Sequence, residues 1–173
     1  TSGRPLPSGR IQPETVLGFG AVCAVSGLLY LALAVNSLTA ALGALTLTLY
    51  LVVYTPLKRI TPLNTVVGAV PGALPPLMGW TASHGDAAAE GWSLFAILFV
   101  WQIPHFLAIA WLYREDYAKA GFAMLPVLDK TGERTRQHVL ISTAGLLLAS
   151  LIPYVLGLTG SVYLVGVVIL NSA

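Results

Sequence analysis

Long stretches without charge most constrain what this chain can fold into. No Lys, Arg, Asp or Glu occurs in the stretches 15–57, 60–85, 91–113 and 137–173. A helix needs roughly 20 mostly apolar residues to cross about 30 Å of hydrocarbon, so the outer two stretches are long enough for two crossings each and the inner two for one. The composition agrees, since 56% hydrophobic and 9% charged residues are ordinary for a polytopic membrane protein and unusual for a soluble domain. The sequence therefore predicts an all-α transmembrane bundle.

Turn residues divide these stretches into individual spans. Asn36-Ser37 predicts a tight hairpin in the first stretch, and Gly157 with Thr159-Gly160 predicts another in the last. A helix over 161–173 would rise only about 20 Å, too little for a crossing. The chain also does not begin with Met. We therefore expect a single domain truncated at both ends, with five complete spans and part of a sixth. The predicted spans are 16–35, 38–55, 62–82, 91–113 and 139–158, with the sixth beginning at 162.

The basic residues predict the orientation of the bundle. With these spans, all nine Lys and Arg residues fall on one side of the membrane. Basic residues near span ends are retained on the cytoplasmic side, so we expect these loops to be cytoplasmic. A basic face also suits an anionic partner, although topology alone accounts for part of this charge. No nucleic-acid partner is expected.

A basic pair follows a proline at the end of the second span. Pro56 restricts the backbone of the residue before it, and Lys58-Arg59 then offers a flexible ammonium group next to a forked guanidinium group. The two together suit a phosphate better than either alone. Basic pairs are also common at span ends for reasons of topology, so both interpretations remain open.

The third predicted span is rich in proline and glycine. Pro71, Pro75 and Pro76 remove backbone donors, which a membrane helix tolerates where neighbouring helices or a wet cavity satisfy the freed carbonyl groups. We therefore expect this span to border a cavity. Gly68 and Gly72 form a GxxxG pair, which is equally consistent with close helix packing and with a substrate-lining wall.

The fourth span carries polar residues at helical spacing. If its helix continues past Tyr113, then Gln102, His105 and Asp116 lie close to one line along it, with His105 and Asp116 about 16 Å apart. Ionisable groups within a membrane are functional candidates. The competing interpretations are a satisfied core histidine for His105 and a solvated loop charge for Asp116.

Six blocks of this sequence, in the same order and across essentially the whole chain, resemble the haem O synthases. These protoheme IX farnesyltransferases belong to the UbiA-type intramembrane prenyltransferases. The blocks are Arg4-Pro5-Leu6-Pro7-Ser8-Gly9-Arg10, the segment 54–59, Asn64, the Gly- and Pro-rich run 68–80, the segment 103–106, and 114–117 with 124–127.

The resemblance implies nine spans around a central cavity in which Mg²⁺ holds farnesyl diphosphate. In the family a first aspartate-rich metal motif precedes the block that begins here at Arg4, so we expect residues 1–173 alone to be inactive. The wider superfamily often has a second aspartate four positions after the one at Asp116, whereas Ala120 stands here. The implied roles are diphosphate binding for Arg4, Arg10, Lys58 and Arg59, metal binding for Glu115 and Asp116, catalysis for His105, Asp116 and Tyr117, and a substrate cavity lined by Asn64, Gln102 and His105.

The implied reaction transfers a farnesyl group to a vinyl group of haem B and adds water, which gives haem O and diphosphate. The resemblance also implies a multi-pass protein of the inner (plasma) membrane, with haem A synthase or a terminal oxidase as candidate partners. A prenyltransferase for a phenolic or quinone-precursor acceptor is the main alternative. A non-enzymatic haem-binding or transport protein is a remote one, because paired in-span histidines and internal repeats are lacking in the sequence. Tyr117 has the further alternative of anchoring at the membrane interface.

Overall fold

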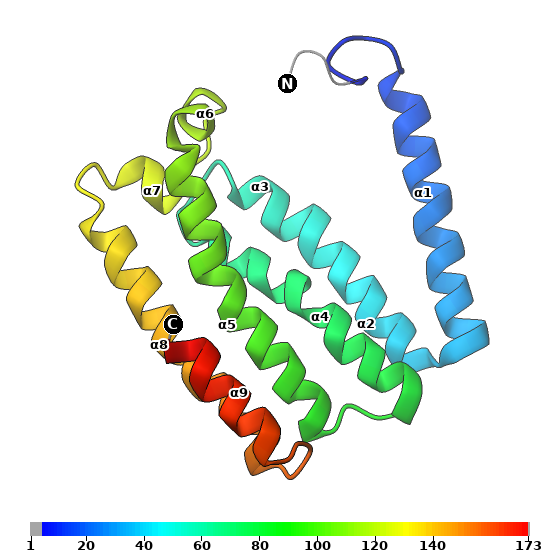
Figure 1. Cartoon of the computed structure of the whole chain (residues 1–173). Coiled ribbons are helices and arrows are strands. Elements are labelled where there is room, and N and C mark those ends of the chain that lie inside the picture. Colours follow the sequence, from blue (N-terminus) through cyan, green and yellow to red (C-terminus); the bar gives the residue numbers. More distant parts are fainter. Residues whose placement is uncertain (1–4, 173) are drawn as a thin grey trace.

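The chain folds into helices joined by short turns (Figure 1). The computed structural model describes residues 5–172, and within that range it contains no strand. Two π-helical segments, η1 and η2, continue the first two long helices. The elements are α1 (Pro13–Tyr30), η1 (Leu31–Val35), α2 (Ser37–Thr48), η2 (Leu49–Tyr54), α3 (Thr55–Leu57), α4 (Asn64–His84), α5 (Ala89–Leu112), α6 (Arg114–Lys119), α7 (Leu125–Leu128), α8 (Glu133–Val155) and α9 (Ser161–Ser172).

Four helices are long and apolar enough to cross a membrane, namely Pro13–Val35, Ser37–Leu57, Ala89–Leu112 and Glu133–Val155. They confirm four of the five complete spans, although the last begins at Glu133 and not at 139 because the charged turn before the apolar stretch is also helical. The fifth predicted span, over 62–82, is not confirmed, because its helix is not among those that are both long and apolar enough to cross a membrane. α4 has the expected length, but buried polar and small residues lower its hydropathy.

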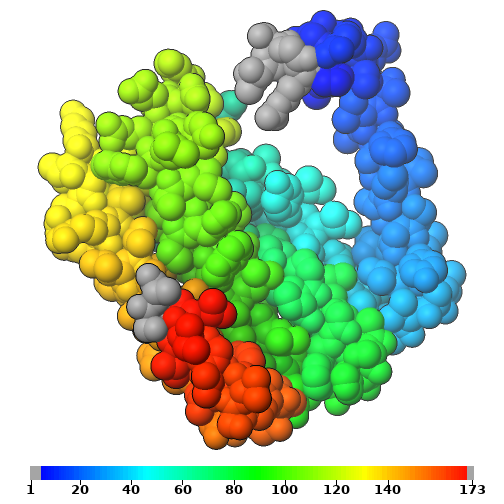
Figure 2. All heavy atoms as spheres, viewed as in Figure 1, coloured from blue at the N-terminus to red at the C-terminus, as the bar shows by residue number. Residues whose placement is uncertain are grey.

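α4 lies at the centre of the bundle, between α2 and α5 (Figure 1). It supplies much of the core through Ala69, Ala73, Leu74 and Leu77, which are at most 3% exposed. α5 in turn packs against α8, and α8 against α9. α1 differs from the others because none of its residues is buried, and Figure 2 shows it standing away from the bundle except near the α1–α2 turn.

The basic segments gather at one end of the bundle. In Figure 1 the start of α1, the α3 segment, α6 and the α7–α8 loop lie at that end, whereas the α1–α2, α4–α5 and α8–α9 turns lie at the other. This arrangement confirms that the basic loops share one face of the bundle, as the spans required.

Asn36 fixes the predicted hairpin between the first two spans. Its side-chain oxygen caps α2 by accepting from the Thr39 N–H at 2.8 Å, and its Nδ2 donates to the Thr81 carbonyl oxygen at 2.7 Å. The hydroxyl groups of Thr39 and Thr81 also lie 2.8 Å apart in the core. The hairpin is thus anchored to α4 by polar contacts that would be costly to leave unmade in an apolar surrounding.

Asp129 organises the start of α8 at the basic end. Its Oδ2 accepts from the backbone N–H and the hydroxyl group of Thr135 at 2.8 and 2.9 Å, and its Oδ1 accepts from the Thr131 hydroxyl group at 3.2 Å. These bonds, the Thr135 backbone bond foremost, hold the pKa of Asp129 below its usual value.

Asp129→Asn is therefore expected to lower thermal stability at neutral pH. A depressed carboxyl pKa contributes stability that is present above the usual Asp value of about 3.9 and is lost as the pH falls through the lower pKa of the folded state. The difference in melting temperature between the two proteins should then narrow in acid. Thermal unfolding of both proteins in detergent, from neutral pH into acid, measures this difference. A difference that stays constant with pH would show that the charge of Asp129 does not stabilise the fold.

Candidate functional site

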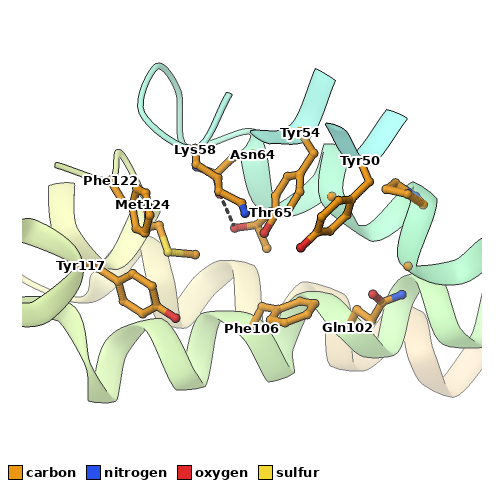
Figure 3. A pocket seen from close by; sticks show the side chains of 13 residues that line it. Tyr50, Tyr54, Lys58, Asn64, Thr65, Gln102, Phe106, Tyr117, Phe122 and Met124 are labelled. Carbon is orange, nitrogen blue, oxygen red and sulfur yellow. Dashed lines mark hydrogen bonds between the residues drawn. The ribbon is translucent and has the colours of Figure 1, made fainter. Parts of the chain in front are cut away.

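A cavity of about 440 Å³ lies toward the basic end of the bundle (Figure 3). Its walls come from η2 and the residue after α3, from α4 and α5, and from the α6–α7 region, which are far apart in the sequence. Its volume is within the usual range for small-molecule sites, and within the described chain its lining contains no carboxylate. The lining residues are Tyr50, Tyr54, Lys58, Asn64, Thr65, Gly68, Pro71, Gly72, Gln102, Phe106, Tyr117, Phe122 and Met124.

The π-helical segment η2 positions two tyrosines and a lysine along one wall. The Thr55 N–H donates to the Tyr50 carbonyl oxygen, five residues earlier, which is the hydrogen bond of a π-helix. Pro56 follows and has no N–H to donate to the four-residue hydrogen bonds of a regular α-helix. Lys58 Nζ lies 4.3 Å from the ring centroid of Tyr54 and 5.4 Å from that of Tyr50. In the part of the chain that is described, Lys58 has no carboxylate partner. A cation held on two aromatic faces and not neutralised by a carboxylate favours an anionic ligand.

The α6–α7 loop is attached to the same wall by two polar contacts. The Ala123 N–H donates to the Lys58 carbonyl oxygen at 2.8 Å, and the Asn64 Nδ2 donates to the Ala123 carbonyl oxygen at 3.1 Å and to that of Thr61 at 2.5 Å. Asn64 is fully buried. It therefore lines the cavity, as predicted, and also joins the start of α4 to the loop that carries Phe122 and Met124.

Gly68 and Gly72 both face the cavity, and both admit a side chain from another element. A Cβ on Gly68 would lie 2.5 Å from Cε2 of Tyr54, and one on Gly72 would lie 2.1 Å from Oε1 of Gln102. The pair thus serves both of the roles left open by the sequence, since it allows close packing and forms a wall. Pro71 lies between them in the lining, which bears out the expectation that this helix borders a cavity.

The predicted polar stripe along α5 is wrong. Gln102 is buried and lines the cavity, and the cavity-facing residue one turn on is Phe106. His105 is exposed, lies outside the lining and stacks on Trp101 with the ring centroids 4.7 Å apart. The helix also ends at Leu112, because Tyr113 adopts φ −107° and ψ 26°, so the line from His105 to Asp116 is not continuous.

The three predicted residues of α6, which follow the break at Tyr113, do not all face the cavity. Tyr117 turns toward the cavity, where its ring centroid lies 5.8 Å from that of Phe122. Glu115 and Asp116 are exposed and line a shallow hollow beside Trp111 and Arg114. Over the residues that the structure describes, no group of three or more His, Cys, Asp and Glu side chains is placed to hold a metal ion.

Two of the other predicted cations, Arg10 and Arg59, lie outside the cavity lining. Arg59 is exposed beside Lys58, and the Arg10 Nε donates to the Ser8 hydroxyl group at 3.0 Å in the segment before α1. Arg4 lies outside the described residues. Of the predicted set, the structure brings together Lys58, Asn64, Gln102 and Tyr117.

The sequence did not identify several of the residues that line the cavity. Tyr50 is four positions before Tyr54, which is four before Lys58, and this helical spacing on an otherwise apolar span was the one signal that pointed to the wall. Phe106 and Met124 lie inside the blocks 103–106 and 124–127 that carry the family resemblance, but no role was assigned to them, and no comparable pattern marked Thr65 and Phe122.

Comparison with known proteins identifies the family. The model of the UbiA prenyltransferase family matches residues 1–173. The chain is 50% identical to the protoheme IX farnesyltransferase of Solibacter usitatus over 99% of its own length and 59% of that protein, and 46% identical to that of Koribacter versatilis over 99% and 56%. The chain thus spans somewhat more than half the length of these curated relatives. No solved structure matches. The chain belongs to the UbiA prenyltransferase family.

Proposed function

We propose that the protein to which this chain belongs transfers the farnesyl group of farnesyl diphosphate to a vinyl group of haem B, with addition of water, and so forms haem O. The observation that carries the proposal is Lys58, a cation held on the faces of Tyr50 and Tyr54 in a cavity without carboxylates in its described lining. The similarity to protoheme IX farnesyltransferases supports the choice of substrates.

The cavity has three properties that favour ionisation of an allylic diphosphate. Lys58 would neutralise the charge that develops on the leaving diphosphate, as fixed positive groups do in other transition states. The rings of Tyr54, Phe106 and Tyr117 would offer their electron-rich faces to the allylic cation. The largely apolar wall would also keep water from the cation before the new bond forms.

The described residues fit Mg²⁺ only in combination with a diphosphate. Glu115 and Asp116 are a pair of carboxylates on an exposed helix, and Mg²⁺ is commonly held by one or two carboxylates together with substrate phosphates. When bound, the ion would neutralise the diphosphate as it leaves. We assign these two residues to that role and Asp116 to catalysis, with Arg4, Arg10 and Arg59 as further diphosphate ligands.

Two further assignments complete the proposal. His105 faces away from the cavity lining and would contact the haem from the outer face of α5, at the iron, a propionate group or a water molecule. The basic end of the bundle would face the cytoplasm of a cell whose inner membrane holds the protein, and a haem A synthase or terminal oxidase would receive the product. These assignments rest on the family resemblance and the distribution of charge.

Asp116→Asn tests the proposed reaction and the proposed metal-binding role of Asp116 together. In membranes that contain the full-length protein, haem B, farnesyl diphosphate and Mg²⁺, we expect the substitution to reduce farnesylated haem by about two orders of magnitude, the usual effect of removing one group that stabilises a charged transition state. Mass spectrometry of haem extracts measures the product, and a chelator should abolish it.

The matched control is Asp86→Asn, which makes the same change in the loop at the opposite end of the bundle and should leave the product yield unchanged. Full activity of Asp116→Asn would remove Asp116 from the site. Prenylation of an added phenolic acid in place of haem would keep the diphosphate chemistry and transfer the function to the quinone-precursor alternative.

A further inference from the structure

Gln102 presents a fixed hydrogen-bond acceptor to the cavity. The side chain is only 7% exposed, and its Nε2 donates to the carbonyl oxygen atoms of Leu98 and Ala69 at 3.1 and 3.4 Å. The opposite orientation of the amide would press its oxygen against two carbonyl oxygens, so Oε1 faces Gly72 and the cavity. No group in the described chain donates to Oε1, which leaves a nearly buried acceptor that needs a partner from outside the protein.

Tyr50 supplies a second polar group at the same end of the cavity. Figure 3 shows its hydroxyl group directed into the cavity, toward the ring of Phe106. This hydroxyl makes no hydrogen bond to the part of the chain that is described. A buried water needs space and two or more polar partners, and the acceptor of Gln102 with the donor and acceptor of Tyr50 meets the second condition in a cavity that easily meets the first.

We propose that Gln102 and Tyr50 hold the water molecule that completes the reaction. The inference rests on the proposed function. As the bond between farnesyl C1 and the diphosphate oxygen breaks, C1 bonds to the terminal carbon of the haem vinyl group, and the positive charge passes to the vinyl carbon attached to the ring. The held water adds its oxygen to that carbon, and its proton goes to the released diphosphate. Gln102 accepts one water O–H and does not take the proton itself.

The proposal makes a distinctive demand on the products. If water does not add to the cation, the carbon next to the charged one loses a proton. The product is then an alkenyl haem, which is lighter than the hydroxylated product by the mass of one water molecule. Gln102 therefore controls the partition between two products and not only the rate. A purely structural role for Gln102 would lower the yield of both products without changing their ratio.

Gln102→Met tests this partition, because it preserves length and approximate volume and removes both amide functions. Full-length protein in membranes is supplied with haem B, farnesyl diphosphate and Mg²⁺, and the two products are separated by mass spectrometry. We expect the ratio of dehydrated to hydroxylated haem to rise about tenfold, the effect of losing one hydrogen bond. Gln102→Glu should restore the hydroxylated product, since a protonated carboxyl keeps one donor and one acceptor. The control, Gln137→Met on the exposed face of α8, should leave the ratio unchanged.

An unchanged ratio in Gln102→Met would overturn the proposal. If Gln102→Met fails to accumulate in the membrane, Tyr50→Phe takes its place, because it removes only a hydroxyl group. The proposal requires that this variant also raise the fraction of dehydrated haem. A wild-type protein that makes neither haem product would refute the proposed function itself, which is a different result from a changed or unchanged ratio.

Discussion

Lys58→Met should raise the KM for farnesyl diphosphate about 10- to 100-fold in the full-length protein. Charged hydrogen bonds are worth roughly 1.5–3 kcal/mol, and Lys58 is the one cation in the described lining of the cavity. Methionine matches the length of the alkyl chain, so the contact with the rings of Tyr50 and Tyr54 largely persists while the charge is lost. Initial rates over a range of farnesyl diphosphate concentrations in membranes measure the effect.

Lys119→Met is the matched control for this experiment. Lys119 lies on the same basic end, in the last turn of α6, and is exposed away from the cavity lining. Its loss changes the net charge equally and should leave the KM nearly unchanged. Equal effects of the two substitutions would mean that the basic face attracts diphosphate as a whole and that Lys58 has no special part in binding it.

Gly68→Ala should lower both stability and diphosphate affinity. The added methyl group would lie 2.5 Å from Cε2 of Tyr54, so the ring must move, and Lys58, whose Nζ lies 4.3 Å from the centroid of that ring, loses its support. Inserting a methyl group into a packed site costs about 1–3 kcal/mol. Thermal unfolding in detergent and the KM for farnesyl diphosphate report the two effects.

Gly79→Ala provides the comparison within the same helix. No heavy atom lies within 4 Å of a Cβ built on Gly79, and alanine favours a helix by up to about 1 kcal/mol over glycine. This variant should be unchanged or more stable. A Gly68→Ala protein that behaves like Gly79→Ala would show that the Tyr54 ring can move aside without loss of stability or of diphosphate affinity.

The length of the charge-free stretches was enough to predict the helices. An apolar run of sufficient length has few alternatives to a spanning helix, because every backbone group must be satisfied within the segment. Asn36 and Gly157 marked the turns correctly, and the basic loops were correctly placed at one end of the bundle (Figure 1). α4 also formed close to the predicted residues, but it is not among the helices apolar enough to cross a membrane, because small and polar residues at the centre of the bundle reduce its apolar character.

Part of the site could also be read from the sequence. Lys58, Asn64, Gln102 and Tyr117 were predicted from a resemblance between motifs and from the rarity of polar groups in a span, and the structure brings them to one cavity. His105 and Asp116 were placed on the same line as Gln102 by assuming one regular helix. That assumption failed at Tyr113 for Asp116. His105 precedes the break and lies outside the lining because it is about 60° from Gln102 around the same helix.

The sequence by itself determined the helices, their turns and the shared face of the basic loops, because these depend on hydropathy and charge along the chain. The tertiary structure alone decided which faces meet around the cavity. The π turn in η2 and the break at Tyr113 each rotate the residues that follow relative to a regular helix, so Tyr54 and Tyr117 face inward while Asp116 does not. The contacts of Gly68 with Tyr54 and of Gly72 with Gln102 join segments that are distant in sequence, and a local pattern contains no information about such contacts.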